Sequence, residues 1–154
     1  MNSLRVARFG FQSRFAWSAQ RILAGLLASC ALLSGCASER HDLELAERAV
    51  DVFHARLNSA EYTLIYQETG DKIKEATSGQ NFVKLLQRVH QTLGAVRNSV
   101  PRGTVFQLAQ GTIRLDYDTT FVRGTGREQF VWQIKGNQAI LHSYRIDSTE
   151  LAGK

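Results

Sequence analysis

Apolar residues between positions 39 and 94 recur at steps of three and four, a spacing typical of helices with one buried face. The stretch over residues 39–58 predicts a first helix, and a short second helix is expected between its cap Ser59 and Gly70. A third helix is predicted from Ser78 to Gly94, which stands where helices commonly end in glycine. The buried side of the first helix is expected to carry Leu43, Ala46, Val50, Phe53 and Leu57.

After Gly94 the spacing changes to alternation of apolar and polar residues, which is typical of half-buried strands. Strands are predicted over residues 111–122, 128–134 and 138–147. An earlier strand is expected between residues 95 and 109, where Pro101 lacks an N–H and therefore suits an edge or a bulge. The sequence thus predicts three helices followed by four antiparallel strands.

The turn between the last two strands predicts their register. With residues 136–137 as a two-residue loop, Trp132 faces Leu141 and Glu128 faces Arg145.

The preceding turn, taken as residues 123–126, makes Tyr117 face Trp132 and Phe121 face Glu128. The two turns together give one apolar sheet face, made of Ile113, Leu115, Tyr117, Phe121, Phe130, Trp132, Ile134 and Leu141. A one-residue error in either turn would instead bring His142 and Tyr144 inward and Glu128 outward.

The N-terminal segment has the three parts of a secretory signal: arginines, an apolar run over residues 22–33, and small residues after it. The twelve residues of that run are too few for a bilayer span, which takes roughly 20. Leu33-Ser34-Gly35-Cys36 resembles the lipobox of bacterial lipoproteins, which implies acyl chains on Cys36 and stable membrane anchoring. Ordinary signal cleavage after Ala37, which would release a soluble periplasmic protein, is the alternative.

The lipoprotein resemblance also implies a location and a domain division. Ala37 stands where lipoproteins retained in the inner membrane typically carry Asp, so the resemblance implies the periplasmic face of the outer membrane of a Gram-negative bacterium. The predicted division is a signal peptide over residues 1–35, a lipidated N-terminus and short tether over 36–40, and a folded domain over 41–150.

The charge distribution argues against nucleic-acid binding. Four of the 19 basic residues precede residue 36, in a segment without Asp or Glu, which leaves 15 basic residues against 14 acidic ones. Phosphate binding needs a concentrated basic face, and none is expected in a nearly neutral domain.

The order of three helices and an antiparallel meander resembles the cone-shaped α+β fold of nuclear-transport-factor-2-like proteins. The segments "REQFVWQIKGNQAILHSYRIDS" and "LGAVRNS" are similar to small bacterial lipoproteins of this fold whose function is unassigned. The resemblance implies three N-terminal helices packed on a curved four-stranded antiparallel sheet. It identifies a fold and not an activity.

Enzymes of this fold class typically place a His or an Asp inside the cone. On the predicted register the only ionisable residues there are Glu128 and Arg145, and a carboxylate beside a guanidinium is a poor general base. A structural ion pair is therefore expected, with ligand contact by Tyr117, Glu128, Trp132 and Arg145 as the alternative. No catalytic residue is predicted.

No metal or other cofactor is expected either. No two histidines lie within five residues of each other, and Asp116 and Asp118 lack the glycine-bearing loop of a calcium site.

The outer sheet face is predicted to carry an unusual number of apolar and aromatic residues, which favours an interface. We expect a homodimer or an envelope-protein partner to contact Val131, Ile140, His142, Tyr144 and Ile146. The predicted function is that of a non-enzymatic binding or interaction lipoprotein. The alternative is a small-molecule binder or an enzyme that uses the aromatic interior with Glu128 and Arg145.

Overall fold

The computed structural model describes residues 38–107 and 110–153. Arg40 to Lys154 form one structural unit. Cys36 and the signal segment over residues 1–35 lie outside the described residues, so lipid attachment remains a prediction. The first described helix includes residues 38–40, which the sequence assigned to a tether.

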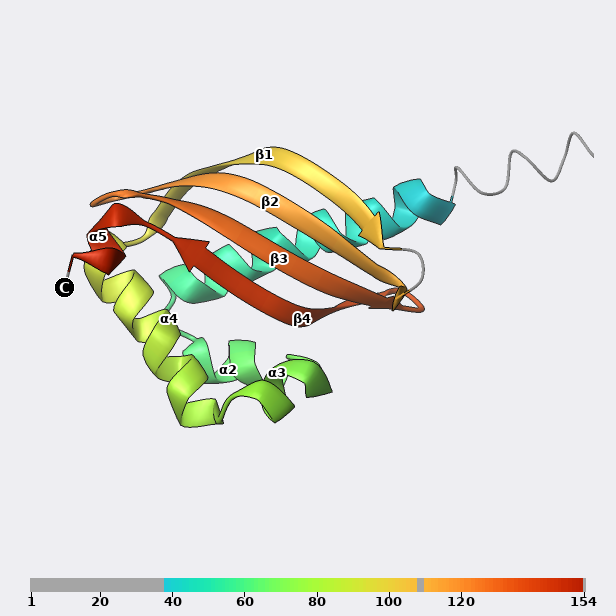
Figure 1. Ribbon diagram of the computed structural model, residues 1–154, viewed down its shortest axis with the longest axis horizontal. Coiled ribbons are helices and arrows are strands. Elements are labelled where there is room, and N and C mark those ends of the chain that lie inside the picture. The colour runs from blue at the N-terminus through green and yellow to red at the C-terminus, as the bar shows by residue number, and fades with distance from the viewer. Residues whose placement is uncertain (1–37, 108–109, 154) are drawn as a thin grey trace, which may run out of the picture. The chain divides into compact units, whose positions relative to one another are not determined.

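Four helices precede the sheet and a short one follows it (Figure 1). They comprise residues 38–58, α2 (Tyr62–Gln67), α3 (Asp71–Ala76), α4 (Gly79–Leu93) and α5 (Thr149–Ala152). The described part of the chain therefore holds five helices, and the predicted number of three is wrong. The two additional helices lack a clear hydrophobic pattern, because α3 buries only Ile73 and α5 spans four residues.

The two ends of α4 agree with the prediction. The side chain of Ser78 accepts a hydrogen bond from the backbone N–H of Asn81, as an N-cap does. Gly94 ends the helix with a φ of 82°, a left-handed conformation that favours glycine. The last carbonyls of α4 also accept hydrogen bonds from the guanidinium of Arg123, which holds the turn over residues 122–124 against the end of the helix.

The four strands form one antiparallel sheet in the order β1-β2-β3-β4, and the fold is α+β. They are β1 (Val96–Gln107), β2 (Thr112–Phe121), β3 (Thr125–Lys135) and β4 (Gln138–Asp147). β1 is an edge strand, and its pairing with β2 is irregular between Pro101 and Gly103, as expected for that proline.

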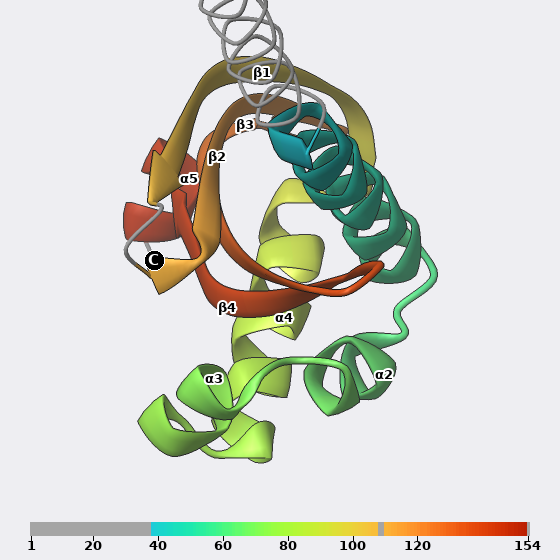
Figure 2. The same cartoon turned by 90° about the vertical axis from the view of Figure 1, so that its right-hand side faces the viewer.

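The core lies between the curled sheet and the helices, with the helix over residues 38–58 along the concave side of the sheet (Figure 2). Phe53 of this helix packs edge-on against Phe130 of β3, with ring centroids 5.2 Å apart. The predicted apolar face of the sheet is buried, apart from the half-buried Ile134. From the sheet the core receives Ile113, Leu115, Tyr117, Phe121, Phe130, Trp132 and Leu141.

The register between β2 and β3 differs from the prediction by four residues. Tyr117 faces Glu128, and Trp132 faces Ile113. The turn is tighter than expected, because the N–H of Phe121 already bonds to the carbonyl of Gly124 and β3 begins at Thr125. Since four is an even number, every side chain stays on its predicted face.

The register between β3 and β4 contains a bulge that the sequence did not reveal. Trp132 faces Leu141 as predicted, but Val131 faces Ser143, which leaves His142 as an extra residue. Beyond this point Glu128 faces Ile146, so the predicted pairing of Glu128 with Arg145 is wrong.

The bulge also changes which residues of β4 point toward the core. Tyr144 and Ile146 pack against the core, and Arg145 points to the opposite face. Their predicted place on the outer face is therefore wrong, although Glu128 keeps its inward position.

Candidate functional site

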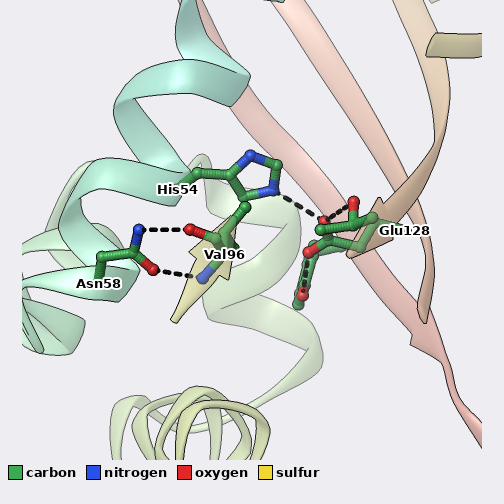
Figure 3. A network of polar contacts seen from close by, with 6 residues as sticks. His54, Asn58, Val96 and Glu128 are labelled. Carbon is green, nitrogen blue, oxygen red and sulfur yellow. Dashed lines mark hydrogen bonds and ion pairs between the residues drawn. The ribbon is translucent and has the colours of Figure 1, made fainter. Parts of the chain in front are cut away.

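A hydrogen-bonded cluster around Glu128 lies inside the core. The carboxyl group of Glu128 is held by three elements: Oε2 lies 2.8 Å from Nε2 of His54 and accepts from the Thr119 hydroxyl at 2.6 Å, and Oε1 accepts from the Tyr144 hydroxyl at 2.7 Å. Figure 3 shows His54 reaching from its helix toward Glu128 on the sheet. Both carboxyl oxygens are therefore occupied by groups of the protein itself.

The local sequence explains how this cluster forms. Thr119 alternates in phase with the buried residues of β2, and Glu128 does so in β3. Tyr144 joins them because of the bulge at His142. Burial, the charge of Glu128 and the hydrogen bond to it hold the pKa of the Tyr144 hydroxyl well above its usual value, so Tyr144 remains a donor.

The cluster is closed to solvent. Glu128 is 1% exposed overall and its side chain is 0% exposed, while the side chain of His54 is 8% exposed. A general acid or base must come within hydrogen-bond distance of the group with which it exchanges a proton. Glu128 has no such access in this structure, and its contacts are those of a structural network.

A cavity of about 230 Å³ lies elsewhere in the fold, between the helix over residues 38–58, α2 and the β3–β4 hairpin. Its walls are mainly apolar, and Trp132, which is 5% exposed, is the largest residue among them. The indole Nε1 of Trp132 is buried and has no hydrogen-bond partner among the described residues. The apolar part of the lining comes from Leu45, Ala49, Val52, Phe53, Ile65, Trp132, Ala139 and Leu141.

Three charged residues line the same cavity: Arg48, Arg56 and Glu68. Arg56 forms an ion pair with Glu68 of the α2–α3 connection. The hydrogen bond that Arg56 donates to Glu68 raises the pKa of the Arg56 guanidinium, against the opposing effect of burial. The cavity thus combines an apolar wall with an excess of one positive charge, which suits an amphipathic ligand.

Three of the four residues predicted as ligand contacts, Tyr117, Glu128 and Arg145, line a second cavity of about 320 Å³. Trp132 lies apart from them, in the cavity beside α2. The carboxyl group of Glu128 belongs to the closed cluster. Tyr117 is buried, and burial together with the charges of Glu47 and Asp51 raises its pKa to about 12. Arg145 lies on the outer face, where it bonds Asp147 at 3.1 Å.

The predicted interface residues are also divided. Val131, Ile140 and His142 remain as candidates on the outer face, where Ile140 and His142 lie beside the α2–α3 connection at Gly70. Tyr144 and Ile146 belong to the core side. The outer face around Arg145 carries mostly charged residues in exposed ion pairs. The apolar surface on which the predicted interface depends is therefore smaller than expected.

Sequence reasoning gave His54 no role in this cluster, although a signal was present. His54 follows Val50 by four residues and precedes Leu57 by three, so it belongs to the buried stripe of its helix. A polar residue in that position needs a partner inside the core. The cavity residues Arg48, Arg56 and Glu68 had no such signal, because their meeting depends on how α2 is placed.

Within residues 38–107 and 110–153, no group of three or more His, Cys, Asp or Glu side chains is arranged to hold a metal ion. In the same part of the chain no helix combines the length and apolar character needed to cross a membrane. Comparisons with protein-family models, curated proteins and solved structures give no match.

Proposed function

We propose that this chain is a non-enzymatic binding protein, anchored through Cys36 at the periplasmic face of the outer membrane. The signal-like segment before Cys36 and the small residues around it support the anchor. A helix that lies along the concave side of a curled antiparallel meander supports a nuclear-transport-factor-2-like fold.

One observation carries the binding function. Among the described residues, the lining of the cavity beside Trp132 is mainly apolar and includes no histidine. The carboxyl–imidazole pair of Glu128 and His54 is closed within its own hydrogen bonds. The carboxylate in the lining, Glu68, is paired with Arg56, so a small molecule can be held there without an unpaired carboxylate or an imidazole to exchange protons with it. The cavity volume of about 230 Å³ is below the roughly 300–1,000 Å³ of pockets for drug-sized ligands, so the ligand is a small one.

Native mass spectrometry of the full chain, extracted gently from the membranes of a Gram-negative host, tests this function. We expect an acylated protein that retains a small non-covalently bound mass in addition to its covalent acyl chains. The variant Ala49→Trp fills the cavity from its helical wall and is expected to lose that mass. Ala55→Trp, on the exposed side of the same helix, is the matched control and is expected to retain it.

Two results would contradict the proposal. A retained mass that is unchanged in Ala49→Trp would show that the ligand lies elsewhere. Membrane association that survives Cys36→Ser would exclude the lipid anchor, independently of the cavity.

A further inference from the structure

The charges at the cavity follow a regular spacing along one helix. Arg48, Val52 and Arg56 are four residues apart and therefore share one helix face. All three line the cavity, and Val52 between the two arginines is 47% exposed. This face thus presents an accessible apolar surface between two guanidinium groups.

The two arginines differ in how they are paired. Arg56 binds Glu68, whereas Arg48 forms no ion pair within the described residues. In the part of the chain that the structure describes, Glu68 is the single acidic residue that lines the cavity, so the lining holds two positive charges and one negative charge. Glu61 also acts on Arg56 through its charge but does not line the cavity, so the lining itself keeps one excess positive charge.

The pair of Arg56 with Glu68 is exchangeable. The side chain of Glu68 is 54% exposed, and ion pairs that face water contribute little net stability. A guanidinium offers five N–H donors in a planar fork that fits a carboxylate with two parallel hydrogen bonds. A ligand carboxylate can therefore bind between Arg48 and Arg56 and replace the carboxylate of Glu68.

We infer that the cavity binds a small amphipathic carboxylate, such as a medium-chain fatty acid. Its apolar part lies against Phe53, Ile65 and Trp132, and its carboxylate lies at Arg48 and Arg56. This inference rests on the proposed binding function and adds the chemical class of the ligand. The selectivity arises from charge, because the apolar wall alone would accept neutral and charged ligands with the same tail equally.

Tryptophan fluorescence provides the test. The sequence holds two tryptophans, so in the full chain with Trp17→Phe the signal reports Trp132 alone. Octanoate, octanol and octylamine have the same apolar tail and differ in the charge of the head group. We expect octanoate to bind at least about tenfold more tightly than octanol, a difference of about 1.4 kcal/mol, and octylamine to bind most weakly.

Three variants identify the residues responsible. Arg48→Gln and Arg56→Gln are each expected to weaken octanoate binding about tenfold and to leave octanol binding unchanged. Glu68→Gln is expected to strengthen octanoate binding, because it removes the competing carboxylate. Arg97→Gln, an exposed change of the same charge on β1 outside the cavity, is the control and leaves both ligands unaffected.

The outcomes separate this inference from the proposed function. Equal binding of octanoate and octanol, or an octanoate affinity that is insensitive to both arginine variants, overturns the carboxylate inference. If octanoate and octanol bind equally and Ala49→Trp abolishes the binding of both, the proposed binding function of the cavity is still supported. If none of the three probes binds, the inference is wrong, and the retained mass in the wild-type protein and Ala49→Trp then decides the proposed function separately.

Discussion

Nε2 of His54 lies 2.8 Å from Oε2 of Glu128, although the two residues are 74 positions apart in the chain. Which group donates in this contact depends on the tautomer of the imidazole, and a proton on Nε2 lets His54 donate to the carboxyl oxygen. The contact joins the first helix to the middle of the sheet inside an otherwise apolar core. It therefore specifies how the helix is seated on the sheet.

Removal of the Glu128 carboxyl group should be among the most destabilising single changes in the domain. Glu128→Ala leaves His54, Thr119 and Tyr144 without their buried partner, and we expect the free energy of unfolding to fall by about 3–5 kcal/mol. Urea denaturation measures this change.

The matched control is Glu75→Ala on α3. The side chain of Glu75 is exposed and lies 4.0 Å from Lys72, so this change should alter stability by no more than about 0.5 kcal/mol. Equal effects of the two variants would contradict a structural role for the Glu128 cluster.

The sequence could predict most strands and their buried faces, because alternation survives an even error in register. The predicted partner of Tyr117 on β3 is wrong, but its predicted position on the buried face of the sheet is correct. The bulge at His142 is an odd change, and it reversed the faces of Tyr144 and Arg145. A bulge of this kind has no compositional signal of its own, and for that reason the Tyr144–Glu128 contact could not be foreseen.

High pH should destabilise the protein through its buried tyrosines. The pKa of Tyr144 in the folded state is raised well above the ordinary value of about 10, and that of Tyr117 is raised to about 12. Above pH 10 the unfolded chain loses these protons first and therefore binds fewer protons than the folded protein. The stability that these tyrosines contribute is complete below pH 10 and declines by about 1.4 kcal/mol per pH unit for each tyrosine above it.

Tyr144→Phe isolates this effect. At pH 8 the variant should be less stable than the wild-type protein by about 1–2 kcal/mol, because Oε1 of Glu128 loses its donor. Since the variant lacks the tyrosine that titrates, the difference should narrow as the pH rises from 10 to 11.5. Chemical denaturation at a series of pH values measures the stability of the variant and of the wild-type protein. A difference that stays constant with pH would contradict a raised pKa of Tyr144.

The first residue of the edge strand depends on a side chain of the first helix. The Asn58 amide accepts from the N–H of Val96 at 2.7 Å and donates to the carbonyl of Val96 at 3.2 Å (Figure 3). Asn58→Ala removes both bonds, and we expect a loss of about 1–2 kcal/mol in urea denaturation.

Ser59→Ala is the control for that change. The sequence predicts Ser59 as a helix cap, but α2 begins at Tyr62 after Glu61, and Ser59 has no side-chain hydrogen bond among those found in the described residues. Its replacement should therefore be nearly neutral. If Ser59→Ala lowered the free energy of unfolding as much as Asn58→Ala, the effect of Asn58→Ala would come from disturbing the loop after the helix. It would not come from the lost hydrogen bonds to Val96.

The bulge itself can be tested by deletion. His142 is the extra residue, so its removal would let β4 continue in regular pairing with its present partners. Tyr144 would stay opposite Phe130 and Ile146 opposite Glu128, both on the core side. We expect the deletion variant to fold and to lose about 0.5–3 kcal/mol, because the core side chains keep their places and only the local bend of the strand is lost. His142→Ala keeps the extra residue, and the Nδ1 atom of His142 has no hydrogen-bond partner within the described residues, so this variant should cost less than about 1 kcal/mol. A deletion variant that fails to fold, while His142→Ala remains stable in urea denaturation, would contradict the assignment of His142 as the extra residue.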